Sequence, residues 1–207
     1  MHATDPSIDE LPLFPLQAVL FPGGLLNLKI FEARYLDLMT TCLRERTPFG
    51  VVALRSGREV RQAQDRVSFE AIGTLAVLIT VDSDSPGILQ VSCRGGSRFA
   101  VLASRQRADG LWLARTEAVA DDAPLAPRES QLASVRGLAD AIAALKAQGV
   151  APFLEPYCFD DAGWVANRWC EILPISPAAK FKLMELPDPV VRLQLVDDYL
   201  RSKGVVG

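Results

Sequence analysis

The spacing of apolar residues changes a little past the middle of the chain. Up to residue 119, short apolar runs alternate with turn signals, as in Leu11–Leu16 and Phe49–Leu54. After residue 127, apolar residues recur every three or four positions. Short runs bounded by turn residues predict strands, and the longer period predicts amphipathic helices. We therefore expect a β-rich part followed by an α-helical part.

The β-rich part is expected to hold about seven short strands and one helix. Besides the two runs above, the predicted strands are Ala18–Phe21, Leu25–Phe31, Ile72–Val81, Ile88–Cys93, Arg98–Ser104 and Leu111–Val119. Turns are expected at Gly23-Gly24, Pro86-Gly87, Gly95-Gly96 and Asp109-Gly110. Between Glu32 and Arg46 the helical spacing of Tyr35, Leu36, Met39 and Leu43 predicts one amphipathic helix. This pattern is typical of a closed or strongly curled β domain.

The remainder of the chain predicts a linker and a small helical bundle. Asp121–Pro127 is rich in proline and aspartate, which divides the chain into a β domain (1–120), a linker (121–127) and helices (128–207). Gly149 is placed to end a long helix, and Asp161, Ser176 and Asp188 are placed to begin three more. The expected buried stripes are Leu132, Val135, Leu138, Ile142 and Leu145 in the long helix and Val190, Leu193, Val196 and Leu200 in the last.

Composition and charge exclude several classes of protein. The 207 residues are 49% hydrophobic and 23% charged, which is ordinary for a globular protein and excludes wholesale disorder and collagen. No apolar run approaches the roughly 20 residues of a membrane span. The first ten residues are polar and acidic, unlike a secretory signal. We therefore expect a cytoplasmic protein without a membrane partner.

The sequence lacks the residues of the common catalytic and cofactor sites. There is no phosphate-binding glycine motif and no GxSxG or HExxH motif. His2 is the single histidine, so a Ser-His or Cys-His pair has no base. Cys42, Cys93, Cys158 and Cys170 are widely spaced, which favours free thiols over a metal site. We predict no catalytic, cofactor-binding or metal-binding residues, and hence a protein that is not an enzyme.

Two further residue patterns are interpreted as structural. The acidic pairs Asp82/Asp84, Asp121/Asp122, Asp160/Asp161 and Asp197/Asp198 are expected in turns, the linker, caps and exposed helix faces. Ser176 and Lys180 resemble a Ser-Lys pair only in spacing, and we expect a helix cap and a solvated lysine. The aromatic residues Tyr157, Phe159, Trp164 and Trp169 are expected to belong to the core.

RNA binding is the alternative that the charge distribution leaves open. Residues 44–115 carry 11 basic side chains, all arginine, against 7 acidic ones. Arg55, Arg58, Arg61 and Arg66 share one predicted loop, and Arg94, Arg98, Arg105 and Arg107 lie in neighbouring predicted strands. Few aromatic residues accompany them, and Glu59 and Asp65 interrupt the loop. A solvated surface of mixed charge is therefore favoured over an RNA site.

Several motifs in order resemble the N-terminal domain of Lon protease. They begin with Leu11–Leu16 (LPLFPL), Val19–Gly23 (VLFPG) and Ile30–Leu36 (IFEARYL). They continue with Phe49-Gly50-Val51, Ile72-Gly73-Thr74, Arg98-Phe99, Trp164–Pro174 (WVANRWCEILP), Lys180–Leu186, Asp188 and Arg192–Leu195. The resemblance extends from about residue 9 to 203. It implies an α+β fold, namely a PUA-like β-barrel with one inserted helix followed by an α-helical bundle.

The resemblance also implies a function without chemistry. The chain ends at Gly207 without ATPase or peptidase modules, so we expect a stand-alone substrate-binding domain related to the Lon-like domain of cereblon. In Lon this region recognises polypeptides, and in cereblon a related domain is a docking scaffold. Within Ile30–Leu36 we expect Phe31, Tyr35 and Leu36 in the core. Glu32 and Arg34 are expected either to form a local ion pair or to hold the start of the helix. No binding residue carries over from the family.

The expected function is therefore polypeptide recognition or protein docking. Apolar segments of an unfolded or flexible partner would lie in a groove between the β domain and the helical part. Binding would be weak and tolerant of sequence, because apolar burial drives it. RNA binding through a basic face of the β domain is the alternative, and DNA is not expected as a partner. The sequence does not identify the residues that form the polypeptide-binding surface.

Overall fold

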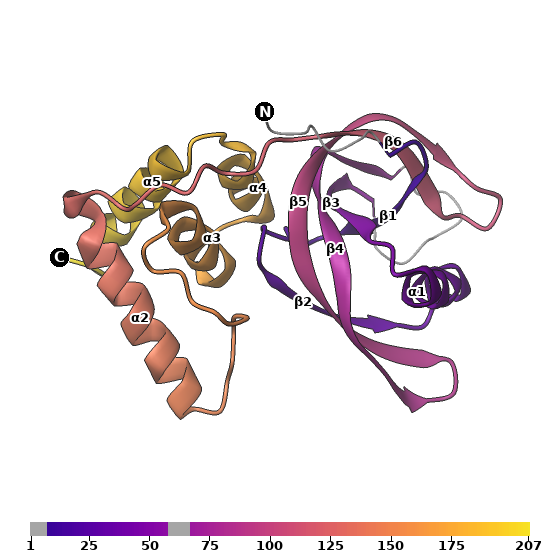
Figure 1. The fold of residues 1–207 in the computed structure, drawn as a ribbon, viewed down its shortest axis with the longest axis horizontal. Helices are drawn as coiled ribbons and strands as arrows, with labels where there is room; N and C mark the ends of the chain where they lie inside the picture. The colour runs from indigo at the N-terminus through magenta and orange to yellow at the C-terminus, as the bar shows by residue number, and fades with distance from the viewer. Residues whose placement is uncertain (1–7, 58–66) are drawn as a thin grey trace. The chain divides into compact units, whose positions relative to one another are not determined.

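The computed structural model describes residues 8–57 and 67–207 and has a mixed α+β fold (Figure 1). His2 and the predicted loop residues Arg58, Glu59, Arg61, Asp65 and Arg66 lie outside the described residues. The strands are β1 (Leu11–Leu16), β2 (Leu25–Ile30), β3 (Phe49–Ser56), β4 (Ser68–Ser85), β5 (Ile88–Gln106) and β6 (Trp112–Ala118). The helices are α1 (Ala33–Glu45), η1 (Glu129–Gln131), α2 (Leu132–Ala147), α3 (Ala162–Ile172), α4 (Pro177–Glu185) and α5 (Pro189–Ser202).

The strands form one sheet, in which β5 has two roles. The strand order is β2-β5-β4-β3-β1-β6, and β5 also pairs with β6. The second half of β5 pairs with β6 from Phe99 to Gln106, so the pairings run from β5 through β4, β3 and β1 to β6 and return to β5. The first half of β5 pairs with β2 from Leu89 to Arg94. Strand β2 is therefore added to the side of this ring of strands.

Two apolar clusters form the core of the strand-rich unit. Leu11, Leu13, Val52, Phe99 and Ala114 form one cluster of buried residues from β1, β3, β5 and β6. The other cluster packs the opposite side chains of β1, such as Phe14 and Leu16, against α1. Helix α1 buries Tyr35, Leu38, Met39 and Cys42, while Leu43 is 58% exposed. The helix was thus predicted correctly, but Leu43 was wrongly placed on its buried face.

Glycine residues explain two differences between the predicted and observed strands. Residues 18–21 are not a strand, because the chain there turns through Pro22 and Gly23 toward β5. Gly23 N donates to Gly95 O at 2.8 Å, and Gly95 N donates to Gly24 O at 2.9 Å. A Cβ atom on Gly95 would lie 2.1 Å from the carbonyl oxygen of Phe21. Gly95 therefore allows a close approach inside a continuous strand, and the predicted turn at Gly95-Gly96 was wrong.

The contacts between residues divide the chain into two compact units, 1–121 and 122–207. In the second unit, the side chains of Asp161, Ser176 and Asp188 accept hydrogen bonds from the first turns of α3, α4 and α5, as predicted. The predicted stripe of α5 (Val190, Leu193, Val196 and Leu200) is buried. In α2, Leu138 and Ile142 are buried, whereas Leu132 is exposed.

Candidate functional site

Strand β2 and the adjoining halves of β5 and β4 form a small three-stranded sheet beside the ring. Leu26 and Leu28 of β2 point into the core around α1. Since side chains alternate across a strand, Leu25, Asn27 and Lys29 point to the opposite side. We call this side the outer face. Its cross-strand rows are Leu25–Arg94–Val77, Asn27–Ser92–Thr80 and Lys29–Gln90–Asp82.

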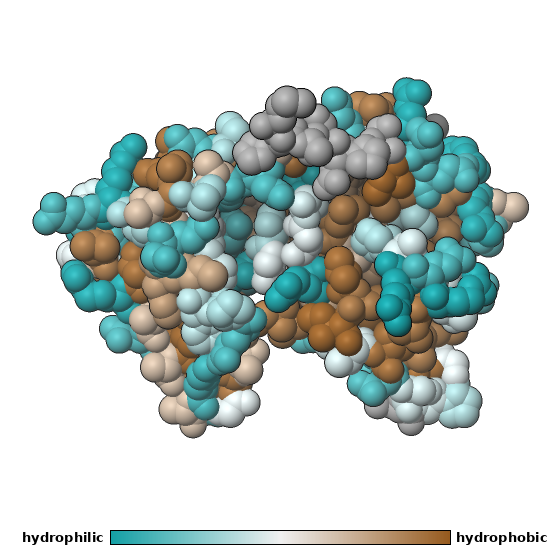
Figure 2. All heavy atoms as spheres, in the orientation of Figure 1, coloured by the Kyte–Doolittle hydropathy of each residue, from teal (hydrophilic) through white to brown (hydrophobic). Residues whose placement is uncertain are grey.

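The outer face exposes large apolar side chains at both ends. Val77 and Ile79 of β4 are each 48% exposed, and Phe31, which directly follows β2, is 54% exposed. The rows between them are polar, and Ser92 Oγ donates to Asn27 Oδ1 at 2.7 Å. Figure 2 shows brown apolar surface lying among teal charged side chains on the face of the molecule that it draws. Val77 and Ile79 at one end and Phe31 at the other therefore offer apolar contact to a partner on the outer face.

The residues that follow Phe31 fix its position. Arg34 pairs with Glu32 at 2.8 Å, as predicted, and its other terminal nitrogen donates to the carbonyl oxygen of Gly110 at 2.8 Å. The Tyr35 ring stacks on Phe14 with 3.9 Å between centroids. Tyr35 is therefore a core residue, as predicted, and Leu36 is partly buried against the core. The prediction that Phe31 belongs to the core was wrong.

Several cavities in the described part of the strand-rich unit open to solvent, and three of them are lined as follows. One of about 240 Å³ is lined by Leu75, Phe99, Thr116 and Ala118, among others. Another of about 290 Å³ lies between β1 and α1, beside Pro12, Leu38 and Cys42. A third, of about 380 Å³, is lined by Asp9, Arg105 and Arg115, among others. These linings offer mainly apolar contact, and of the three only the last brings acidic and basic side chains together.

The arginines that suggested RNA binding are mostly occupied by other contacts. Arg98 is buried and donates to the carbonyl oxygen of Ala120 at 3.0 Å. Arg55 pairs with Glu70 at 3.1 Å, Arg107 pairs with Asp109 at 2.9 Å, and Arg105 pairs with Glu10. Arg94 is exposed on the outer face. The described arginines therefore do not form a continuous basic track.

The predicted cysteines and acids take structural positions. Burial raises the pKa of both Cys93 and Cys170 to about 12, so neither thiol is a ready nucleophile. Cys42 is buried as well, while Cys158 is partly exposed. Across residues 8–57 and 67–207, no group of three or more His, Cys, Asp or Glu side chains could hold a metal ion.

Two acidic pairs and one lysine differ from the prediction. Asp82 was expected in a turn but lies in strand β4, opposite Gln90 of β5. Asp197 was expected on an exposed helix face but is 2% exposed, and it accepts hydrogen bonds from Ser134 Oγ at 2.6 Å and Arg201 Nε at 2.7 Å. Ser176 caps α4 as predicted. Lys180 was expected to be solvated, but its Nζ donates to the carbonyl oxygen of Glu171 at 2.9 Å. Lys180 therefore fastens α4 to the end of α3.

The aromatic residues of the helical unit form a cluster around Trp164. Phe153, Tyr157 and Phe159 lie with ring centroids 5.3 to 6.4 Å from that of Trp164. Only Phe153 of these is fully buried, so the prediction of a core role holds for Trp169 but only in part for the others. The buried guanidinium of Arg168 lies beside the cluster and pairs with Glu171 at 2.7 Å.

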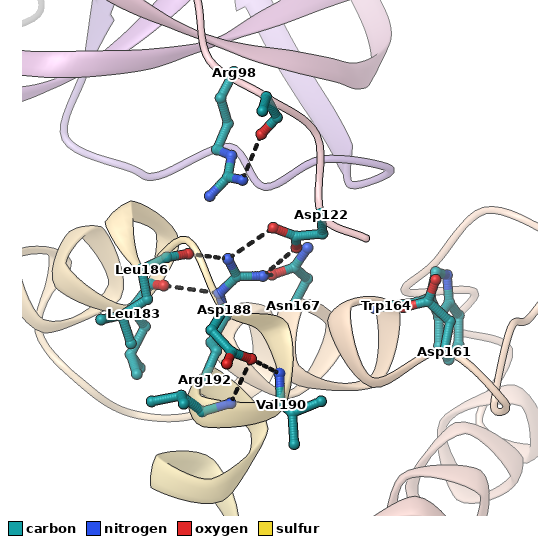
Figure 3. A network of polar contacts seen from close by, with 12 residues as sticks. Arg98, Asp122, Asp161, Trp164, Asn167, Leu183, Leu186, Asp188, Val190 and Arg192 are labelled. Atoms are coloured by element: carbon teal, nitrogen blue, oxygen red, sulfur yellow. Dashed lines mark hydrogen bonds and ion pairs between the residues drawn. The ribbon is translucent and has the colours of Figure 1, made fainter. Parts of the chain in front are cut away.

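A buried arginine fastens the start of the helical unit (Figure 3). Arg192 of α5 donates to the carboxylate of Asp122, to Asn167 Oδ1 and to the carbonyl oxygens of Leu183 and Leu186. Leu125 O accepts from Ala162 N at 2.8 Å. Part of the segment predicted as a linker is thus bonded to the helices.

Comparisons with known proteins agree with this fold. Residues 10–202 match the family described as the ATP-dependent protease La (LON) substrate-binding domain. A crystal structure of a Lon N-terminal domain protein from Xanthomonas campestris has a TM-score of 0.71 at 30% identity, covering 91% of this chain and 97% of that one. The N-terminal domain of Mycobacterium avium complex Lon protease has a TM-score of 0.58 at 15% identity, covering 92% of this chain and 97% of that one, and shows the fold alone.

Comparison with curated proteins gives no match. Among the helices that the structure describes, none is long and apolar enough to cross a membrane. The family match spans both compact units and includes every described helix and strand. The chain therefore belongs to the family of LON substrate-binding domains.

Proposed function

We propose that this protein is a non-catalytic module that binds unfolded or flexible polypeptides, either as a substrate-recognition domain or as an adaptor. The observation that carries the proposal is the match to a substrate-binding domain over residues 10–202. We also propose the finer fold that the sequence predicts, with a PUA-like barrel followed by a helical bundle, and a cytoplasmic location. The domain boundaries 1–120, 121–127 and 128–207 remain part of this proposal.

The outer face supports polypeptide binding on physical grounds. Its exposed apolar residues Phe31, Val77 and Ile79 can be removed from water by an apolar segment of a partner. Such burial stabilises a complex by about 25 cal/mol per Å², from which the cost of ordering a flexible chain is subtracted. Binding that depends on apolar area tolerates many sequences, which suits a partner without a fixed fold.

The side chains most suited to chemistry support a role without catalysis. Ser176 caps a helix, and Lys180 donates to a backbone carbonyl oxygen 2.9 Å away. The thiols of Cys93 and Cys170 are buried, and their pKa is raised to about 12. A nucleophilic thiol needs an adjacent base or a lowered pKa, and burial shifts the pKa of both thiols in the opposite direction.

The proposal is tested by titrating the full chain into two labelled probes. One probe is a reduced and carboxymethylated globular protein, which stays unfolded, and the other is a single-stranded RNA. We expect saturable binding of the unfolded protein that persists when salt is raised, because apolar burial is not screened. Binding of RNA alone, lost steeply with salt as counterion release requires, would replace this proposal with the alternative.

A pair of variants tests whether the unfolded protein binds at the outer face. Substituting both Val77 and Ile79 by Thr retains strand-forming side chains and removes apolar surface. We expect this double variant to bind the unfolded protein more weakly. The same substitution at exposed Leu102 of β5, outside the outer face, is expected to leave binding unchanged.

A further inference from the structure

Strand β2 has one paired edge and one open edge. Among the strands of residues 8–57 and 67–207, it stands at the end of the strand order and pairs only with β5 (Figure 1). The six pairs from Leu25–Arg94 to Ile30–Leu89 follow one another without a register shift. An exposed edge of a regular strand presents unpaired N–H and C=O groups that can pair with another chain.

The hydrogen bonds next to β2 identify the groups on its open edge. Gly95 N donates to Gly24 O, and Gly24 is the residue directly before β2. In an antiparallel pair, residues that bond to the partner strand alternate with residues that point away from it. Leu26, Leu28 and Ile30 therefore bond to β5, and the main chain of Leu25, Asn27 and Lys29 points outward. Within the described chain, no turn, loop or side chain bonds to the main chain of these three residues.

The other open edge in this sheet is less suited to pairing. Beyond Ala76, which pairs with Phe49 of β3, strand β4 also has no second neighbour among the described strands. Its pairing with β5 shifts register between Leu78 and Thr80 and again between Ser83 and Ser85. Such bulges interrupt the alternation of donors and acceptors, and they protect edge strands from unwanted pairing. A regular ladder of main-chain bonds is therefore available on β2.

The charges around β2 restrict what can pair with it. Lys29 and Arg94 are exposed on the outer face, and neither takes part in an ion pair within the described residues. Asp82 lies one strand further from the open edge than Arg94. A segment added to β2 would therefore meet positive charge together with the apolar side chains of Leu25 and Phe31. Two copies of this chain paired through β2 would instead bring like charges onto one face.

We propose that an extended segment of a polypeptide substrate, apolar with at least one acidic side chain, adds to β2 as a further strand of the sheet. This inference rests on the proposed function and specifies how the substrate is held. Main-chain bonds to Leu25, Asn27 and Lys29 bind the segment independently of its sequence, and the side chains on the outer face select its charge.

The first test changes the peptide and leaves the protein intact. The probe is a labelled alternating Val-Thr peptide with one central Glu, about as long as a typical strand. N-methylation of alternate residues removes every N–H on one edge of the peptide. We expect methylation on one edge to weaken binding by at least about tenfold and methylation on the other edge to have little effect. Equal effects of both patterns would overturn the proposal.

The second test changes the open edge of the protein. Asn27→Pro removes an outward N–H, whereas Asn27→Thr keeps it, and both lose the hydrogen bond from Ser92. Proline is tolerated on the solvent side of an edge strand, and circular dichroism checks that both variants fold. We expect Asn27→Pro to bind the peptide about tenfold more weakly than Asn27→Thr. Replacing the central Glu of the peptide by Lys should weaken binding to the native chain.

Amide hydrogen exchange gives a readout that does not depend on a variant. Saturating peptide should slow exchange at Leu25, Asn27 and Lys29, with little change at Leu26, Leu28 and Ile30. If the unfolded protein binds but exchange at these three amides is unchanged, strand addition is wrong and the proposed function stands. If neither the unfolded protein nor the peptide binds, both the proposed function and the addition of a strand to β2 are wrong. Sedimentation measures the oligomeric state. If the native chain is a dimer and Asn27→Pro is a monomer, a second copy of the chain and not a substrate pairs with the open edge of β2.

Discussion

The guanidinium group of Arg192 holds the carboxylate of Asp122, which is 70 positions earlier in the chain. The two residues form an ion pair with N–O distances of 2.5 and 3.2 Å, and Arg192 is 1% exposed. Its remaining donors reach Asn167 and the carbonyl oxygens at the end of α4 (Figure 3). One side chain therefore donates hydrogen bonds to a carboxylate, to a side-chain amide and to two backbone carbonyl groups.

Replacing Arg192 by Met should destabilise the protein strongly. The substitution keeps apolar volume but removes a buried charge and its hydrogen bonds to the half-buried carboxylate of Asp122 and to two carbonyl groups, which costs about 3–5 kcal/mol. Urea unfolding followed by circular dichroism measures the free energy of unfolding. Lys182→Met is the matched control, because its ion pair with Glu185 is exposed and contributes at most about 1 kcal/mol. An equal decrease in the free energy of unfolding in both variants would show that the burial of Arg192 adds nothing to the effect of its ion pair on stability.

Replacing Gly95 by Ala should disturb the attachment of β2. Its Cβ atom would lie 2.1 Å from the carbonyl oxygen of Phe21, a backbone atom that moves only with the chain around Gly23 and Gly24. Overpacking of this kind costs about 1–3 kcal/mol. In Gly96→Ala the nearest atom is 3.4 Å away, so thermal unfolding should show a much smaller decrease in melting temperature. A similar decrease for both variants would contradict the close-approach explanation.

Much of the fold could be predicted from local sequence signals. Asp161, Ser176 and Asp188 were correctly predicted as caps because a cap depends on residues within one turn. The stripe of α5 was also predicted correctly, since its buried face follows the helical period. The continuous strand through Gly95-Gly96 was missed, because the need for glycine comes from Phe21, far away in sequence.

The candidate site was harder to predict, because exposure depends on which side of an element faces the core. Leu43 and Phe31 look like core residues in the sequence, yet both are more than half exposed. Conversely, Asp197 and Arg192 look like surface residues but are buried by partners more than sixty positions away. The edge position of β2 follows from strand order, which a hydrophobic pattern does not specify.

Glu171 should make the stability of the protein depend on pH. Burial raises the pKa of this carboxyl to about 7, although Arg168 opposes the rise. The folded protein therefore binds more protons than the unfolded chain between about pH 4.5 and 7, so stability should fall as pH rises through this range. The contribution is up to about 3 kcal/mol. Glu171→Gln should lose this component of the pH dependence in urea unfolding, and parallel curves for the two proteins would show that Glu171 stays ionised.

Phe31 and Tyr35 lie four positions apart in one motif, and their substitutions should have opposite consequences. Tyr35 is 3% exposed and stacks on Phe14, so Tyr35→Ala should destabilise the protein by about 3–5 kcal/mol. Phe31 is largely in water, so Phe31→Ser should change stability by no more than about 0.5 kcal/mol while it weakens binding of the unfolded protein probe. Parallel measurements of unfolding and probe binding separate the two effects. A Phe31→Ser variant that binds normally would show that the apolar end of the outer face next to β2 does not contact the polypeptide.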